Sequence, residues 1–302
     1  MGRAMTVTFD ASWTAIDRRL GHWWQMQGAQ PQQAGRFDPA HPGAVPPGPV
    51  LICGDPRLAG LPGGLAPLPA KPGDLMPLPA PRQAGAEPAQ TWLCPGLQQQ
   101  APRDLLEGAE TAIAGFLALN PRWDGVICLP GPRTHWAQIS AEEVVSVQSF
   151  LSLTLAGALE QDRDPDPDAE RDPGPERQAE AGSPPDAKPG PDPDILAEAA
   201  ADTLSRPEAL AQRLNAARAA GRLDADPPSV ARARVLGALI GAELAAARPY
   251  WLGQQIAVLG LAGDAAPYLV ALRAQAAMVT EADAAPMIRA GLVGAWRRLA
   301  GA

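Results

Sequence analysis

The chain has 302 residues, of which 46% are hydrophobic and 5% aromatic, and its formal net charge is −8. This length is enough for two domains, or for one large domain with a sizeable core. The negative charge argues against a nucleic-acid-binding surface, because phosphate backbones are bound by a clustered excess of Lys and Arg. Lys71 and Lys188 are the only lysines, and this bias toward arginine, together with 30 Gly and 35 Pro, is typical of a GC-rich bacterial genome.

Cysteine usage and apolar runs indicate where the chain resides. Cys53, Cys94 and Cys128 each stand alone in or beside an apolar run, which favours buried thiols in a reducing cytoplasm over a metal site or disulfides. The N-terminus lacks the apolar core of a signal peptide. The best candidate for a membrane span, VLGALIGAELAAA (235–247), is too short and carries Glu243. We therefore expect a soluble cytoplasmic protein that contacts no membrane.

The first third of the chain predicts short strands separated by turns. The weak alternation of residues 5–17 ends in WTAID, which predicts a strand that closes on Asp17. Abundant Pro and Gly without periodicity predict a loop over 27–49. PVLICG (49–54) and TWLCPG (91–96) each predict a buried strand stopped by a turn, and the spacing of apolar residues predicts an amphipathic helix over 103–119.

The middle of the chain predicts a hairpin followed by a linker. GVICLP (125–130) predicts a strand, Gly131 a turn, and residues 136–139 a returning strand; residues 142–160 begin strand-like and become helical. Residues 161–194 hold almost nothing that could be buried, so they cannot repay the entropy of ordering. We expect a disordered acidic linker there, with a functional acidic tail as the alternative.

The last hundred residues are predicted to be mainly helical. Helices are expected over 195–205, 207–223 and 229–251, followed by a strand, a helix, a strand and a closing helix over 254–263, 266–275, 276–280 and 284–300. Strands that alternate with helices imply parallel pairing in an α/β domain. A similar alternation in the first half suggests two α/β lobes, which we place at 1–125 and 126–302 with the linker 161–194 inside the second.

Five short motifs run along the chain: WTAID (13–17), LCPGL (93–97), EGAETA (107–112), LPGPRTHWA (129–137) and GALIGAE (237–243). In order and spacing they resemble motifs of the 2-dehydro-3-deoxygalactonokinases, over most of the chain apart from the acidic insert. The resemblance implies an α/β protein with the two-lobed, actin-like fold of sugar kinases, built from two ribonuclease H-like domains.

The resemblance also implies a function. It is the ATP-dependent phosphorylation of 2-dehydro-3-deoxy-D-galactonate in D-galactonate catabolism, with ATP and Mg²⁺ as cofactors and a small sugar acid as partner; a homodimer is left open. In this fold each lobe brings a glycine-containing hairpin to the ATP phosphates, and a carboxylate of the first hairpin holds Mg²⁺ through water. The site residues it implies are Asp17 and Glu110 in catalysis, Asp17 also at the metal, Gly131, Thr134 and His135 at the phosphates, and Gly108 and Thr111 at the substrate.

The chain departs from the family pattern at the polar positions of these motifs. Arg-Arg-Leu-Gly (18–21) stands where the family has Trp-Gly-Thr-Ser, and Pro132, which has no N–H to donate, replaces a threonine. His135 replaces a lysine, and Glu107 an arginine. These changes predict that kinase activity is absent or altered. The alternatives are a pseudokinase that binds a sugar acid or a partner protein, and a decaying gene product without activity.

Several of these residues also have ordinary structural interpretations. Asp17 could cap a turn, Glu110 could be a solvated carboxylate on a helix, and His135 a histidine on the surface of a hairpin. We expect Arg18 and Arg19 to face solvent. The kinase interpretation requires the bends near 17–21 and 130–135 to face each other across a gap between the lobes.

Overall fold

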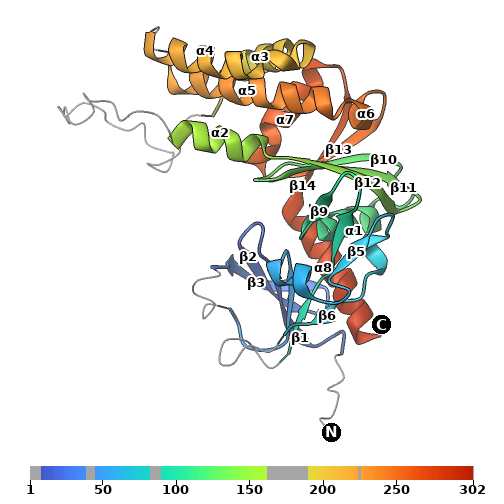
Figure 1. Cartoon of the computed structure of the whole chain (residues 1–302). Helices are drawn as coiled ribbons and strands as arrows, with labels where there is room; N and C mark the ends of the chain where they lie inside the picture. Colours follow the sequence, from blue (N-terminus) through green and yellow to red (C-terminus); the bar gives the residue numbers. More distant parts are fainter. Residues whose placement is uncertain (1–7, 39–44, 82–89, 162–189, 224–225, 302) are drawn as a thin grey trace, which may run out of the picture.

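The structure, a computed structural model, describes residues 8–38, 45–81, 90–161, 190–223 and 226–301. Most of the predicted acidic linker, residues 162–189, lies outside these ranges. Within them, no helix is long and apolar enough to cross a membrane. The chain is a mixed α/β protein with two main sheets, as its alternating pattern predicts (Figure 1).

The first main sheet has six strands. In spatial order they are β3 (Gln30–Arg36), β2 (His22–Gln27), β1 (Ser12–Asp17), β4 (Val50–Cys53), β7 (Thr91–Leu93) and β6 (Leu78–Pro79). β1 pairs in parallel with β4, so that Asp17 lies opposite Cys53 and both strands end at the same edge of the sheet. The predicted loop over 27–49 is wrong, because β3 lies inside it. β3 is an almost wholly exposed polar strand that is held by its backbone pairing with β2, so it has no apolar pattern.

The second main sheet has five strands. In spatial order they are β12 (Glu143–Phe150), β11 (Thr134–Ser140), β10 (Gly125–Leu129), β13 (Gln255–Gly260) and β14 (Met278–Asp283). The hairpin of β10 and β11 around Gly131 is confirmed. The predicted parallel pairing is confirmed as well, since β10 pairs in parallel with β13 and β13 with β14.

A small third sheet has one strand before, and two strands after, β6 and β7 of the first main sheet in sequence. Its strands are β5 (Leu65–Pro67), β8 (Gly96–Gln99) and β9 (Asp104–Leu106), and two 3₁₀ helices, η2 (Pro56–Gly60) and η3 (Pro72–Asp74), lie nearby in sequence. The helix predicted over 103–119 begins only at residue 109, as α1 (Ala109–Leu119). Its first residues instead form β9, which pairs with β8, and Gly108 separates the two elements with a φ of +99°.

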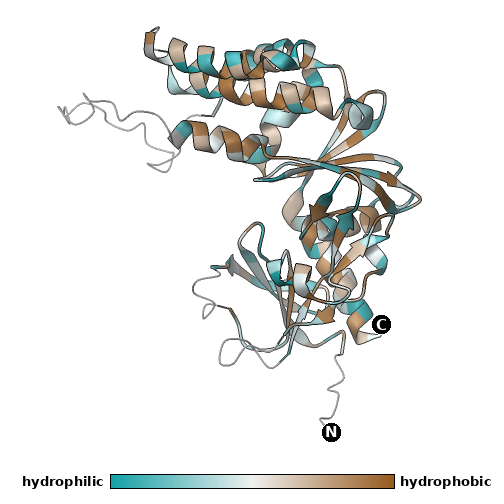
Figure 2. Cartoon of the chain, viewed as in Figure 1, coloured by the Kyte–Doolittle hydropathy of each residue, from teal (hydrophilic) through white to brown (hydrophobic). Residues whose placement is uncertain are grey.

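Helices cover the second main sheet and fill one end of the molecule. They are α2 (Ser152–Gln161), α3 (Pro193–Ser205), η4 (Pro207–Ala209), α4 (Leu210–Leu223), α5 (Pro228–Ala246), α6 (Arg248–Trp251) and α7 (Ala262–Ala274). α3, α4 and α5 lie side by side, and α5 presents apolar residues along its length (Figures 1 and 2). Gly241 permits the close approach of α3 and α5, because a Cβ there would lie 2.3 Å from the carbonyl oxygen of Ala200.

The last helix, α8 (Ala284–Ala300), begins directly after β14 of the second sheet but packs on α1 and the first sheet (Figure 1). Trp296 stacks on Trp13 of β1 with ring centroids 4.6 Å apart. A Cβ on Gly115 of α1 would lie 1.8 Å from the carbonyl oxygen of Met287, so the two helices touch backbone to backbone. α8 therefore completes the core of the first sheet, while the predicted lobe boundary at residue 125 stays a prediction.

Candidate active site

Turns from four parts of the chain converge on one side chain, that of Arg19. Its Cγ lies 3.5 Å from the position a Cβ would take on Gly54, and its Cδ lies 3.0 Å from that position on Gly108. Its Nη2 lies 3.6 Å from the same position on Gly131. Arg19 therefore runs from the turn after β1, past the ends of β4 and β9, to the β10–β11 turn. The two bends that the sequence predicts to face each other lie within reach of one side chain.

Two glycines make this convergence sterically feasible. Gly54 and Gly108 have φ angles of +73° and +99°, which L side chains rarely adopt. A Cβ on Gly108 would lie 2.9 Å from the Cα of Gly54, so the backbones of the two turns are almost in contact. The alkyl part of Arg19 lies over both glycines, where side chains would otherwise exclude it.

Asp17 is fully buried at the end of β1. Its Oδ1 accepts a hydrogen bond of 2.9 Å from the backbone N–H of Arg19 and contacts the thiol of Cys53 at 3.6 Å. Its Oδ2 is buried and has no partner among the described residues. Burial raises the pKa of this carboxyl, although the positive charge of Arg19 acts to lower it. The turn-capping interpretation accounts for one oxygen of Asp17 and leaves the other free for a ligand.

The expectation that Arg19 faces solvent is wrong. Its Nη1 is buried and, in the part of the chain that the structure describes, has no hydrogen-bond partner. The guanidinium lies close enough to Glu110, His135 and Asp264 for its charge to alter the pKa of each. A cation thus sits at the centre of the site with an N–H group unsatisfied.

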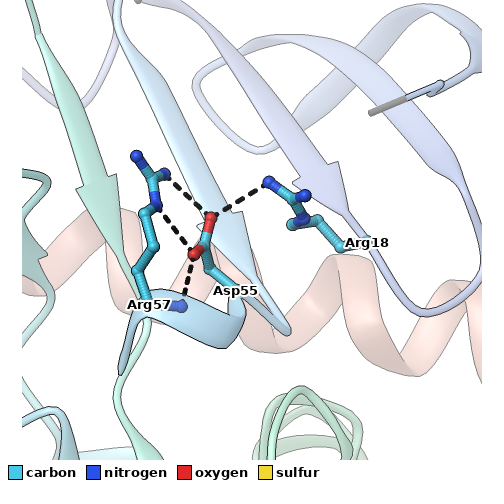
Figure 3. Close-up of polar contacts among 3 residues, drawn as sticks. All are labelled: Arg18, Asp55 and Arg57. Carbon is cyan, nitrogen blue, oxygen red and sulfur yellow. Dashed lines mark hydrogen bonds and ion pairs between the residues drawn. The ribbon is translucent and has the colours of Figure 1, made fainter. Parts of the chain in front are cut away.

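Arg18, by contrast, is bound to Asp55, and Figure 3 shows the cluster they form with Arg57. Asp55 is fully buried; its Oδ2 accepts from Arg18 at 3.2 Å and from Arg57 at 2.8 Å, and its Oδ1 accepts from the backbone and side chain of Arg57. Burial acts to raise the pKa of Asp55, but the hydrogen bonds and charges of the arginines lower it overall. Sequence reasoning missed this residue, although Gly54-Asp55 directly after an apolar strand is a visible signal.

Glu110 lies in the first turn of α1 and is only 2% exposed, so the interpretation as a solvated carboxylate is wrong. Its oxygens accept the backbone N–H of Gly108 at 3.0 and 2.8 Å, and Oε1 also accepts the hydroxyl of Thr111 at 3.2 Å. Burial raises the pKa of Glu110 to about 8 in spite of these bonds. Gly108 and Thr111, which the resemblance implies at the substrate, thus form one connected turn with Glu110, which it implies in catalysis.

Thr134 follows the second bend, and its side chain points into the protein interior. Its hydroxyl lies 2.8 Å from the hydroxyl of Tyr268, which donates to Oε2 of Glu243 at 2.8 Å. Glu243 also accepts from the indole N–H of Trp136 at 2.8 Å and from the hydroxyl of Ser152. Burial raises the pKa of Glu243, although the hydrogen bonds from these three donors act to lower it. The network secures the base of the hairpin and already engages the Thr134 hydroxyl.

His135 is only 4% exposed, so the interpretation as a surface histidine is wrong. Its Nδ1 lies 2.7 Å from Oγ of Ser149, on β12, and Ser149 donates to Oδ1 of Asp104, on β9, at 2.7 Å. Burial, together with the charges of Arg19 and Arg133, holds the pKa of His135 well below its usual value. Sequence reasoning missed Ser149 and Asp104, because they are brought to His135 by strand pairing.

A cavity of about 460 Å³ opens beside the second bend. It is lined by Pro132, Leu153, Thr154, Gly157, Ala158 and Asp264. This volume is within the range of small-molecule sites. Asp264 lies in the first turn of α7; burial raises its pKa, and the nearby charge of Arg19 opposes that rise, so this side of the cavity lies near Arg19. Among the described residues, no group of three or more His, Cys, Asp or Glu side chains could hold a metal ion directly.

Comparison with known proteins adds three findings. A family model described as 2-keto-3-deoxy-galactonokinase matches residues 47–295. A Rhizobium meliloti protein named as a probable 2-dehydro-3-deoxygalactonokinase is 26% identical over 210 residues, which are 68% of this chain and 64%, less than two thirds, of that relative. A crystal structure from Sinorhizobium meliloti with the same provisional assignment superposes with a TM-score of 0.75 at 21% identity, over 95% of this chain and 96% of that one. The structural likeness establishes a shared fold.

Proposed function

Because the chain belongs to the 2-keto-3-deoxy-galactonokinase family, as its five motifs predict, we propose that it is an ATP-dependent kinase for a 2-keto-3-deoxy sugar acid. The substrate we assign is 2-dehydro-3-deoxy-D-galactonate. We also assign to the chain the two-lobed, actin-like arrangement, with one main sheet in each lobe and the nucleotide between the turn after β1 and the β10–β11 turn. The convergence of these turns on Arg19 supports this arrangement.

One observation carries the proposal: two unsatisfied buried groups of opposite charge belong to the same turn. They are Oδ2 of Asp17 and Nη1 of Arg19. Leaving a buried polar atom without a partner costs about 1–3 kcal/mol, and more where the group is charged. A hydrated Mg²⁺ ion with a phosphate group would satisfy both, because the water donates to the carboxylate and the phosphate accepts from the guanidinium. The pair therefore fits a nucleotide phosphate with its metal.

The residues of the two bends are assigned to the metal and the phosphate groups. Phosphoryl transfer depends mostly on positioning and on neutralising charge, which Mg²⁺ supplies when bound. Asp17 would hold the metal through water, and Gly131 leaves room for phosphate at the second bend. Arg19 supplies the donor that Pro132 lacks. Thr134 holds the β10–β11 turn in place through the hydrogen bond between its hydroxyl and that of Tyr268.

The β9–α1 turn is the best candidate for the substrate side of the site. Gly108 exposes backbone without a side chain, and Glu110 with Thr111 forms a buried polar pair at the start of α1. A carboxyl whose pKa is raised to about 8 is largely protonated at neutral pH, so it can donate to a sugar-acid oxygen. We therefore assign Glu110 the role of placing the substrate.

A coupled assay of ADP release with ATP, Mg²⁺ and 2-dehydro-3-deoxy-D-galactonate tests the proposal. We expect turnover that needs all three components and that falls by about a hundredfold or more in Asp17→Asn. This variant keeps an oxygen for the N–H of Arg19, so its fold should be preserved. A wild-type rate equal to that of a control without enzyme would refute the kinase assignment.

The second candidate function is a non-catalytic binding protein, and the position of Arg19 favours it. Its side chain fills space beside Gly54, Gly108 and Gly131 that a phosphate would otherwise enter. In this case calorimetry should show binding of the sugar acid without binding of ATP–Mg²⁺. Binding of both ligands, with turnover, would exclude this function.

A further inference from the structure

His135, Ser149 and Asp104 form a hydrogen-bonded relay across three strands, β11, β12 and β9. Ser149 Oγ lies 2.7 Å from Oδ1 of Asp104 and 2.7 Å from Nδ1 of His135. A carboxylate only accepts hydrogen bonds, so the single hydroxyl proton of Ser149 points to Asp104. The serine oxygen must then accept from the histidine, which fixes the ring proton on Nδ1.

The carboxylate that begins the relay is itself held in place. Oδ1 of Asp104 also accepts the backbone N–H of Leu105 at 2.7 Å, which orients it toward Ser149. At the other end, burial and the charges of Arg19 and Arg133 oppose a second proton on the ring and lower the pKa of His135. The imidazole is thus neutral, with its proton on Nδ1 and a lone pair on Nε2.

We propose that His135 accepts, through Nε2, a hydrogen bond from a hydroxyl group of the sugar acid. This inference rests on the proposed function and changes one part of it, because His135 was expected at the ATP phosphates. A lone pair repels phosphate oxygens, which are acceptors, whereas a sugar hydroxyl can donate to it. In this proposal, Arg19 and Arg133 bind the anionic groups of the ligands.

The position of His135 suits this role. It lies on β11 four residues beyond Gly131, and its relay partner Asp104 lies on β9, just before the turn of Gly108. The charges of Arg19 and Arg133 act on the ring from the two bends. The ring therefore lies near both bends, and we place its Nε2 where the proposed phosphate and substrate sides of the site meet. The relay prevents the ring from exchanging its tautomer.

Histidine-selective nitrogen-15 NMR of the full chain tests the inference, because the chain has three histidines and few signals overlap. Loss of one set of signals in His135→Gln assigns the ring. At neutral pH we expect the proton on Nδ1 and none on Nε2. Saturating 2-dehydro-3-deoxy-D-galactonate, without ATP, should shift the Nε2 signal more than the Nδ1 signal.

Two serines of β12 provide a matched pair of variants. Ser149→Ala should remove the tautomer preference, because the acceptor for Nδ1 is lost. Ser146→Ala should leave the His135 signals unchanged, because the Ser146 hydroxyl donates to Gln138 at 3.3 Å. Equal effects of both substitutions would contradict the relay.

The outcomes separate this inference from the proposed function. A proton on Nε2, a charged ring at neutral pH, or an Nε2 signal that does not move while calorimetry shows the sugar acid bound would each overturn the acceptor role alone. If calorimetry shows that the sugar acid does not bind, the proposed substrate is wrong, and the acceptor role is refuted with it.

Discussion

The guanidinium of Arg19 ends beside Gly131, with Nη2 3.6 Å from the position that a Cβ on residue 131 would take. The two residues belong to turns of different sheets and are more than a hundred positions apart in sequence. One side chain thus spans the distance between the two turns. A phosphate that enters this space must either displace the guanidinium or bind to it.

Substitution of Arg19 distinguishes binding from displacement. We expect Arg19→Gln to weaken ATP–Mg²⁺ binding by about tenfold or more, because a hydrogen bond from a charged group contributes about 1.5–3 kcal/mol. The free energy of unfolding should not fall, since the side chain loses no hydrogen bond to any residue that the structure describes. Arg18→Gln is the matched control: Arg18 is bound to Asp55, so affinity should stay within about twofold. Calorimetry that shows tighter binding in Arg19→Gln would mean that Arg19 blocks the site.

Glu110 should make stability depend on pH. Because its folded pKa of about 8 lies above the ordinary value of 4.5, its stabilising contribution is complete below about 4.5 and is lost as pH rises through about 8. The loss is on the order of 5 kcal/mol, at about 1.4 kcal/mol per pKa unit. Urea unfolding below and above this pH window should show a lower free energy of unfolding at the higher pH in wild type. The decrease should be much smaller in Glu110→Gln. Parallel pH profiles of the two proteins would be inconsistent with a buried, protonated Glu110.

The contact between α1 and α8 should make Gly291 irreplaceable. A Cβ there would lie 2.0 Å from the carbonyl oxygen of Thr111, so Gly291→Ala must push the helices apart and should cost about 3 kcal/mol or more. In the same helix, a Cβ on Gly294 would have Arg298 Nη1 as its nearest neighbour, at 3.6 Å. Gly294→Ala should therefore stabilise the protein by up to about 1 kcal/mol through helix propensity. Thermal unfolding of both variants measures the difference, and similar values would argue against this packing.

Substitution of Gly108 by alanine should destabilise the protein for two reasons. Alanine there would be strained at a φ of +99°, and its Cβ would lie 2.9 Å from the Cα of Gly54. Gly63, with a φ of +75° and Leu78 Cδ1 4.0 Å from its Cβ position, shares only the first cost. We expect Gly63→Ala to lose about 1–2 kcal/mol and Gly108→Ala clearly more. Urea unfolding compares them; an equal loss would show that the turns of Gly54 and Gly108 can separate at little cost.

The sequence predicts those elements of the fold whose signal is local. The buried strands β4, β10 and β13 are apolar runs that are stopped by glycine or proline, and each was located correctly. β3 was missed because an exposed edge strand formed by backbone pairing carries no apolar alternation. The start of α1 was placed too early because the apolar residues of β9 continue the helical spacing, although Gly108 marks the break.

The candidate site could be predicted only in part, for a related reason. Motifs place Asp17 at the end of a strand and Gly131 at a turn, because each directly follows an apolar run, whereas Gly108 was predicted to lie inside a helix. The burial of His135 and of the Nη1 atom of Arg19 was not predicted, because it depends on elements that are distant in sequence. Ser149 meets Asp104 across 45 positions, and no local pattern encodes that contact.

The stacking of Trp13 on Trp296 has a consequence for synthesis of the protein. β1 leaves the ribosome early, yet α8, which covers it, is made some 270 residues later. Domains tend to fold from the N-terminus as they emerge from the ribosome. In the nascent first sheet, Trp13 therefore lacks its stacking partner Trp296 for most of translation. During that interval this apolar face of the sheet is exposed to solvent.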